Sequence, residues 1–203
     1  MNTLSYILDR FDLAAHIGRM PWEVPDFGRD DLAQLFAELG FISGVEIGVE
    51  RGLYTEVLCR ANPQATIYAI DAWHAYSRYR EHVSQDKLDG FYEMAKVRLA
   101  PYPLCRLMRR FSMDAAEDFE DCSLDFVYLD GNHDFRHVVD DLSEWSKKVR
   151  PGGIVAGHDY RSDKANIPFH VKQAVGGFTN AYHIEPWFVL RGDRAASWMW
   201  VKE

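Results

Sequence analysis

The fold is decided by the stretch GVEIGVERG at residues 44–52, which continues as LYTEVL at residues 53–58. Apolar residues lead into an acid, two glycines bracket a turn, and a helix-like pattern follows. That order of strand, glycine turn and helix N-terminus is how an open α/β sheet builds a nucleotide pocket. Glycine is needed because the backbone bends sharply there and a ligand must approach it closely. We therefore predict a strand over 43–49 and a helix over 53–60.

The residues of this turn indicate which ligand it binds. The dinucleotide fingerprint requires a glycine at position 50 and another beyond 52, whereas this chain has Gly48 and Gly52 with Glu50 between them. Together with Glu46, Glu50 would repel a pyrophosphate. A cationic nucleoside that carries an amino acid, such as S-adenosylmethionine (SAM), fits better. Glu46 is expected to fix the loop or to contact the ammonium group of SAM through water.

The helix that follows the turn supplies a second expectation. Its first N–H groups, at Tyr54 and Thr55, are expected to point toward the carboxylate of the cofactor, because the N-terminus of a helix favours anions.

The rest of the chain alternates between strand and helix patterns. Further strands are expected over 66–71, 105–110, 124–129, 154–156, 182–190 and 197–202, and helices over 32–39, 86–99, 112–119, 134–149 and near 170–176. This alternation predicts an α/β fold with a doubly wound, mostly parallel, seven-stranded Rossmann-like sheet. The last two strands share a short turn, which predicts one antiparallel strand near the C-terminus. We expect a single domain over 1–203, with residues 1–29 as an N-terminal helical arm and 30–203 as the core.

Composition narrows the function. The 203 residues carry a net charge of −8, and a nucleic-acid-binding protein usually has a basic footprint, so no nucleic acid partner is expected. No apolar run approaches the roughly 20 residues of a membrane span, and no secretory signal is present. The three cysteines lack a C-x-x-C pair and are expected to be small core residues in a reducing cytoplasm. The N-terminal arm and several tryptophans favour a homodimer.

Acidic residues follow most of the predicted strands, and ligands of open α/β sheets bind at those carboxyl ends. Asp71 ends the strand 66–71 and is expected to accept both hydroxyls of a ribose, with Ala72 beside it. Trp73 is expected to stack on the adenine, or else to be a core aromatic. Asp114 is expected to accept the adenine amino group, while Ser112 caps the short helix that carries it.

With these motifs in view, the chain resembles a known family. Val45-Glu46-Ile47-Gly48 with Gly52, Ile70-Asp71, residues 124–130 and Pro151-Gly152-Gly153-Ile154 look like the ordered motifs of class I SAM-dependent methyltransferases. Within that class, Asp130-Gly131-Asn132-His133 with Asp141-Leu142 and Trp145, and then Gly157-His158-Asp159-Tyr160, resemble a bacterial subgroup of small-molecule O-methyltransferases. That subgroup includes relatives of the macrocin O-methyltransferases and of cephalosporin-hydroxylase-like proteins.

The chain departs from these relatives at two positions. Glu50 replaces the middle glycine of the commonest turn pattern, which puts the shape of the loop in question. His158 stands where the macrocin-type enzymes have the first of two adjacent aspartates, which puts a metal site in question.

The resemblance implies methyl transfer from SAM to a hydroxyl of a small molecule, such as a sugar or a natural product. A sugar hydroxyl needs a base or a Lewis acid to become nucleophilic. Asp130 and Asp159 are expected to hold a divalent cation with His158 or His133 as third ligand; two carboxylates suit Mg²⁺, and a histidine favours Mn²⁺, Fe²⁺ or Zn²⁺. The predicted metal ligands are Asp130, His158 and Asp159, and the candidate catalytic residues are His133, Asp130 and His158.

Several alternatives stay open at this point. His133 or His158 could act as a general base without metal, or His133 could only cap the helix at 134 while His158 orients Asp159. The chain could also be a SAM-binding protein without transfer activity. An NAD-dependent oxidoreductase is disfavoured by the glycine pattern and by the antiparallel last strand.

Overall fold

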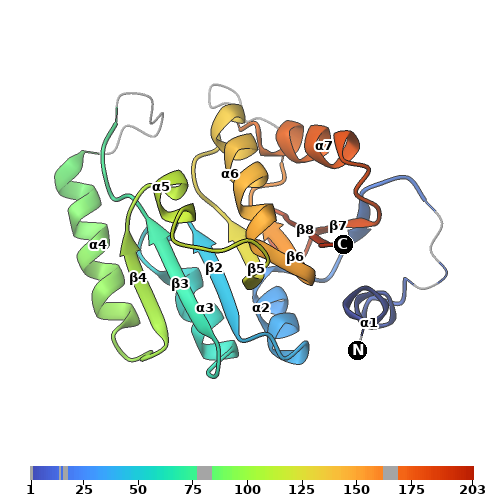
Figure 1. Cartoon of the computed structure of the whole chain (residues 1–203), viewed down its shortest axis with the longest axis horizontal. Coiled ribbons are helices and arrows are strands. Elements are labelled where there is room, and N and C mark those ends of the chain that lie inside the picture. Colours follow the sequence, from blue (N-terminus) through green and yellow to red (C-terminus); the bar gives the residue numbers. More distant parts are fainter. Residues whose placement is uncertain (1, 14, 16–17, 77–83, 162–168) are drawn as a thin grey trace.

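The computed structural model describes residues 2–13, 15, 18–76, 84–161 and 169–203 and contains one sheet with helices on both faces (Figure 1). The strands are β1 (Trp22–Val24), β2 (Ser43–Ile47), β3 (Thr66–Asp71), β4 (Cys105–Arg109), β5 (Leu124–Leu129), β6 (Val149–Gly157), β7 (Trp187–Leu190) and β8 (Ser197–Val201). The helices are α1 (Thr3–Arg10), α2 (Arg29–Glu38), α3 (Leu53–Ala61), α4 (Gln85–Leu99), α5 (Ser112–Ala116), α6 (Phe135–Lys148) and α7 (Val171–Ala181).

The strand order of the sheet is β1-β7-β8-β6-β5-β2-β3-β4. All neighbours are parallel except β8, which is antiparallel to both β6 and β7. The predicted doubly wound sheet with one antiparallel strand near the C-terminus is therefore confirmed. The direction of winding reverses between β2 and β5, and in an open α/β sheet this switch point is where a crevice opens beyond the strand ends.

The sheet has eight strands rather than the predicted seven, because β1 adds an edge strand. It pairs in parallel with β7, in the register Trp22↔Phe188 and Val24↔Leu190. A three-residue strand with prolines on both sides is too short to be recognised from its sequence pattern, so we did not predict it. Residues 1–29 therefore contribute a helix and a strand of the sheet, rather than a helical arm alone.

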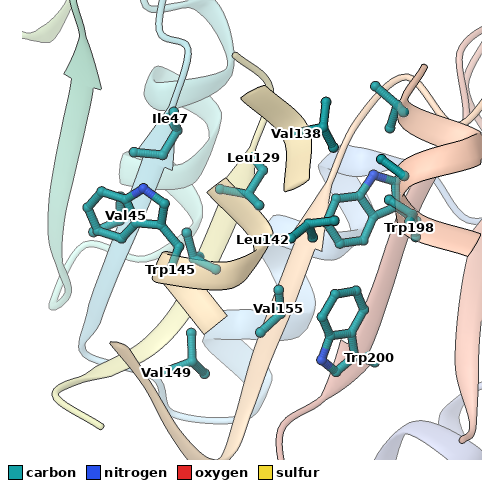
Figure 2. Close-up of a cluster of buried hydrophobic side chains, with 14 of the residues drawn as sticks. Val45, Ile47, Leu129, Val138, Leu142, Trp145, Val149, Val155, Trp198 and Trp200 are labelled. Carbon is teal, nitrogen blue, oxygen red and sulfur yellow. The ribbon is translucent and has the colours of Figure 1, made fainter. Parts of the chain in front are cut away.

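Two hydrophobic layers hold the helices against the sheet. On one face, the apolar stripe predicted for α6 is confirmed: Leu142 and Trp145 are fully buried and lie against the strands (Figure 2). The indoles of Trp198 and Trp200 on β8 stack with ring centroids 5.3 Å apart on the same face. On the opposite face, α2 and α3 cover the sheet, and Phe36 of α2 stacks on Phe126 of β5 at 4.0 Å between ring centroids.

The start of α2 differs from the prediction in a way that matters for the site. We predicted a helix that begins at residue 32. Instead α2 begins at Arg29, Gly28 is the N-cap residue, and Asp31 Oδ2 accepts a hydrogen bond from the Gly28 N–H at 2.9 Å. This earlier start places the side chain of Arg29 at the beginning of the helix.

The three cysteines differ in exposure. Cys59 is buried and Cys105 half-buried, as expected of small core residues, but Cys122 is exposed and sits in a turn with φ 59°, so that part of the prediction is wrong.

None of the helices within the described ranges is long and apolar enough to cross a membrane.

Candidate functional site

A cavity of about 500 Å³ opens at the carboxyl ends of β2, β3 and β5, where the winding of the sheet reverses. Most of the residues predicted from the sequence to bind the cofactor or to act in catalysis line it. These are Glu46, Gly48, Tyr54, Asp71, Ala72, Trp73, Ser112, Asp130 and His133. Five predicted residues are not part of its lining, namely Gly52, Thr55, Asp114, His158 and Asp159.

The glycine turn below the cavity has an unusual backbone. Gly48, Glu50 and Gly52 all have positive φ angles, of 92°, 50° and 74°. At Gly48 a Cβ atom would lie 2.1 Å from the carbonyl oxygen of Asp130, so no other residue fits between β2 and the end of β5. Glu50 takes the left-handed conformation that glycine adopts most easily. The turn therefore has the shape that three glycines would give it, although Glu50 replaces the middle one.

Hydrogen bonds to Asp71 and Trp73 hold Glu50 in this conformation. Asp71 Oδ2 accepts from the Glu50 N–H and Oδ1 from the Trp73 N–H, each at 2.9 Å. The Trp73 indole N–H donates to the Glu50 carbonyl at 2.8 Å. Burial raises the pKa of Asp71, which these backbone donors only partly counteract. Asp71 thus supports the loop with its carboxylate, and its ribose-binding role stays a prediction.

Trp73 has a different role from the stacking platform that we preferred. Its side chain is only 1% exposed and packs with Leu88, Ala95 and Leu99 between the sheet and α4. A ring that is covered in this way offers no open face for adenine. The alternative reading, a core aromatic, agrees with the structure.

Glu46 lies beneath the turn, as the sequence indicated, and is 1% exposed. Its carboxylate accepts a hydrogen bond from the hydroxyl of Thr55, which is itself fully buried on α3. Burial raises the pKa of Glu46 to about 8, because the ionised form loses its hydration. The side chains of Glu46 and Thr55 therefore join β2 to the first turn of α3.

At the β4 end of the cavity, one expectation is wrong and one residue was missed. Asp114 is exposed and outside the lining, so it is not placed to accept an adenine amino group. Ser112 does not cap α5, whose N-cap residue is Phe111. Instead the Ser112 hydroxyl donates to Asp141 Oδ1 on α6 and accepts from the Trp145 indole N–H at 2.7 Å.

Asp141 is the acid that takes the position we assigned to Asp114. It lines the cavity, is 7% exposed, and has its pKa raised to about 7 by burial. The sequence carried a signal for it, because Asp141 continues the inward positions Val138, Leu142 and Trp145 of an amphipathic helix. A carboxylate at such a position is unusual and indicates a buried polar site.

At the other end of the cavity, two acids and two histidines lie together. His133 Nε2 is 2.9 Å from Asp159 Oδ2 and 3.8 Å from Asp130 Oδ1. His158 Nδ1 is 3.6 Å from Asp130 Oδ1 and 3.9 Å from Asp159 Oδ1. Burial acts to raise the pKa of Asp130, but the two histidines lower it below its ordinary value, while both acids raise the pKa of His158.

Within this group, Asp130, His133 and Asp159 each offer a ligand atom, and the three atoms lie within 4.8 Å of one another. We predicted Asp130, His158 and Asp159 as metal ligands, with His133 as the alternative to His158. In the structure, the three ligand atoms that lie close together belong to Asp130, His133 and Asp159. Sequence order could not decide between the two, because both histidines follow the end of a strand closely, His133 after β5 and His158 after β6.

Arg161 and Phe169 complete this group and were missed. Asp159 has a positive φ of 55°, and its Oδ1 forms an ion pair with Arg161 Nε at 3.0 Å. The guanidinium of Arg161 lies 3.9 Å from the centroid of the Phe169 ring, and that ring lies 4.7 Å from the imidazole of His133. A cation–aromatic stack thus supports the imidazole from outside the cavity.

Arg29 is a further lining residue that we did not predict. Its guanidinium carbon lies 5.2 Å from the centroid of the Tyr54 ring, on the side of the cavity where α3 begins.

Comparison with known proteins identifies the class to which this fold and cavity belong. A family model described as a methyltransferase domain matches residues 45–160, which is more than half of the chain. The chain therefore belongs to this family of methyltransferase domains, and the predicted class is confirmed.

Solved structures agree on the fold. The O-methyltransferase TomG from Streptomyces achromogenes, in complex with SAM, is 18% identical with a TM-score of 0.62, over 100% of this chain and 91% of that one. An O-methyltransferase from Bacillus cereus, in complex with SAH, is 16% identical with a TM-score of 0.58, over the same shares.

Among curated proteins, an uncharacterised protein of Sinorhizobium fredii, y4gI, is 26% identical over 119 residues. That match spans 57% of this chain and only 13% of the relative, which is a much longer protein.

Proposed function

We propose that this protein transfers the methyl group of SAM to a hydroxyl group of a small molecule. The observation that carries the proposal is the convergence of Asp130, His133 and Asp159 at one end of a methyltransferase cavity. The same cavity also contains Asp71, at the end of β3, and Asp141, on α6, which are carboxylates of the kind that bind ribose and adenine. Support also comes from the O-methyltransferases with SAM or SAH that share the fold.

In the proposed reaction the hydroxyl oxygen attacks the methyl carbon of SAM. The carbon–sulfur bond breaks, its electron pair stays on sulfur, and S-adenosylhomocysteine leaves as a neutral thioether. Holding the two reactants in line supplies much of the acceleration, about 7–11 kcal/mol in favourable cases. The hydroxyl proton must also be removed, and this is the task that we assign to the acidic end of the cavity.

His133 can take that proton. Its Nε2 lies 2.9 Å from Asp159 Oδ2 and 3.8 Å from Asp130 Oδ1. Both carboxylates stabilise the positive charge that the imidazole gains when it accepts the proton. Arg161 holds Asp159 from the far side, so the carboxylate keeps its orientation during the transfer.

The same three residues also have the donor set of a divalent cation, two carboxylates and an imidazole, within a suitable span. Such a cation, when bound, would act as a Lewis acid that lowers the pKa of the acceptor hydroxyl. One observation favours the histidine route: Arg161 already balances the charge of Asp159, which weakens the attraction for a cation. Both routes use Asp130, His133 and Asp159.

Two measurements test the proposal. Thermal unfolding with SAM, S-adenosylhomocysteine or NADH should give a rise of several degrees with either SAM ligand, because tight binding stabilises the folded state. A rise with NADH alone would overturn the proposal. The second is formation of S-adenosylhomocysteine from SAM with a panel of catechols, phenols and sugars. Turnover with none of them, despite tight SAM binding, would instead favour a binding protein without transfer activity.

The metal is tested with the same assay. Activity that persists in EDTA would exclude the cation and leave His133 as base, whereas activity that EDTA abolishes and Mg²⁺ or Mn²⁺ restores would establish the cation. The homodimer and a cytoplasmic location stay predictions.

A further inference from the structure

Arg29 reaches the cavity from outside the region that the methyltransferase family model matches, residues 45–160. It is the first residue of α2, and its guanidinium lies over the ring of Tyr54, which lines the cavity from the first turn of α3. The same cavity is lined by Glu46 of β2 and by Asp130, which follows β5.

The backbone of Arg29 is held from two directions. The Tyr54 hydroxyl donates to the Arg29 carbonyl at 2.7 Å, and the Arg29 N–H donates to Asp193 Oδ2 at 2.6 Å. The preceding Gly28 makes room for this contact, because a Cβ atom there would lie 2.8 Å from the Asp193 carboxylate. The start of α2 is thus fixed to α3 and to the turn between β7 and β8. A side chain on so firmly held a backbone is well suited to a ligand.

The charges around the cavity single out Arg29. The lining contains two other arginines, and each is paired: Arg51 with Glu50 at 3.2 Å, and Arg110 with Asp118. The guanidinium of Arg29 forms no ion pair and no hydrogen bond with any residue that the structure describes. An arginine that is half-buried without an anionic partner beside acidic residues is a ready site for an anion.

The neighbouring helix strengthens this site for an anion. The first backbone N–H groups of α3 have no carbonyl acceptor within the helix. The helix dipole also places partial positive charge at this end. Arg29 and the start of α3 therefore present two kinds of donor on one side of the cavity. The remaining lining includes Asp130, whose carboxylate suits a cation.

We propose that Arg29 binds the α-carboxylate of the methionine moiety of SAM. This inference rests on the proposed function and adds a cofactor-binding residue from the N-terminal segment. An amino acid carries a carboxylate and an ammonium group close together, which matches a cation and acids on adjacent sides of one cavity end. The planar guanidinium can hold both carboxylate oxygens at once. The alternative ligand of Arg29 is the carboxylate of an anionic methyl acceptor, and the test below separates the two ligands.

The test compares three ligands by isothermal titration calorimetry: S-adenosylhomocysteine, its decarboxylated analogue, and 5′-methylthioadenosine. The wild type should bind S-adenosylhomocysteine at least ten-fold more tightly than the decarboxylated analogue. Arg29→Gln should weaken the binding of S-adenosylhomocysteine about 10- to 100-fold, as expected for a lost charge-assisted hydrogen bond. The same substitution should change the affinity for the other two ligands less than about three-fold. Arg29→Lys should recover part of the loss, since it restores the charge without the planar fork.

Arg10→Ala is the matched control. Arg10 also lies over an aromatic ring, that of Phe27 at 5.3 Å, but it is outside the cavity lining. The control should bind all three ligands like the wild type.

Each result has a defined meaning. Equal weakening of all three ligands by Arg29→Gln, or none, would overturn the inference while leaving the proposed function intact. Unchanged S-adenosylhomocysteine binding with a raised KM for an anionic acceptor would assign Arg29 to the acceptor and also overturn it. Failure of the wild type to bind S-adenosylhomocysteine would overturn the proposed function itself. The wild-type comparison with the decarboxylated analogue does not depend on a variant folding.

Discussion

The two ends of the cavity are built differently. Two carboxylates of the lining have neutral donors: Asp71, at the end of β3, accepts from two backbone N–H groups, and Asp141, on α6, accepts from the Ser112 hydroxyl. At the end beyond β5 and β6, ionisable side chains face one another instead, with His133 near both Asp130 and Asp159.

This difference indicates which residues bind the cofactor in a fixed geometry and which form the reaction centre. Hydrogen bonds from the backbone fix a geometry and change little with protonation, so they suit the binding of a constant cofactor. Side chains that titrate against one another can move a proton within the group. We therefore expect substitutions at the two ends to affect different measurements, and the following predictions test this separation.

The largest effect is expected at the reaction centre. His133→Ala should lower kcat about 100- to 10,000-fold, the usual contribution of a general acid or base, with any acceptor that supports turnover. Binding of S-adenosylhomocysteine should change only a few-fold, because Asp71, at the end of β3, lies two strands away from Asp130 and His133, which follow β5. Substitution of His183, an exposed histidine outside the cavity, is the control and should leave kcat unchanged. A normal kcat in His133→Ala would show that the cluster does not activate the hydroxyl.

An intermediate effect is expected on the pH dependence of stability. Burial raises the pKa of Glu46 to about 8 and that of Asp141 to about 7, whereas unfolded carboxyl groups titrate near about 4. Between these values the folded state binds more protons at these two groups than the unfolded state does. Their contribution to stability is therefore complete below about pH 4 and is lost as the pH rises through about 7 to 8. Each group contributes at most about 1.4 kcal/mol per pH unit.

The variant Glu46→Gln tests this, because glutamine cannot ionise. Urea unfolding at several pH values between 5 and 8.5 should show a shallower decline in the variant than in the wild type. Glu185→Gln, at an exposed position, should follow the wild type. An identical decline in Glu46→Gln and the wild type would mean that the carboxyl of Glu46 is ionised at no cost in the folded protein.

The smallest effect is expected in the turn. Glu50 has a φ of 50°, and this conformation costs a residue with a Cβ about 1–2 kcal/mol. Glycine avoids this cost, but its greater conformational freedom in the unfolded state cancels part of the gain in stability. Glu50→Gly should therefore raise the Tm by a few degrees, with about 2–4 °C expected per kcal/mol for a chain of this size. Glu50→Ala is the matched variant, because it also removes the carboxylate but keeps the Cβ. A Tm for Glu50→Gly at or below that of Glu50→Ala would contradict the argument.

The predictions that agree with the backbone of the structure concern the turn and the strand ends. Gly48 and Gly52 were predicted from their place between a strand and a helix, and both have the positive φ angles that such a turn requires. Asp71 and Asp130 were predicted because carboxyl ends of parallel strands share one edge. These inferences need only local pattern and the general rule of the fold.

The residues predicted wrongly, or not at all, depend on contacts between distant segments. Asp114 and Asp141 are both acids near expected strand ends, and only the packing of α6 against α5 decides that Asp141 is the one that faces the cavity. Trp73 was assigned to the cofactor because it follows Asp71, but α4 covers its ring. Arg29 has no motif around it in the sequence.

The sequence by itself determined the fold class, the glycine turn and the edge of the sheet where the site lies, because strand and helix periodicity and glycine stereochemistry are local properties. The tertiary structure alone decided that His133, rather than His158, joins Asp130 and Asp159. It also brought Arg29 to the cavity and gave Glu50 the conformation of a glycine. The physical reason is that side-chain packing and hydrogen bonds between elements far apart in the chain fix these positions, and no local pattern encodes them.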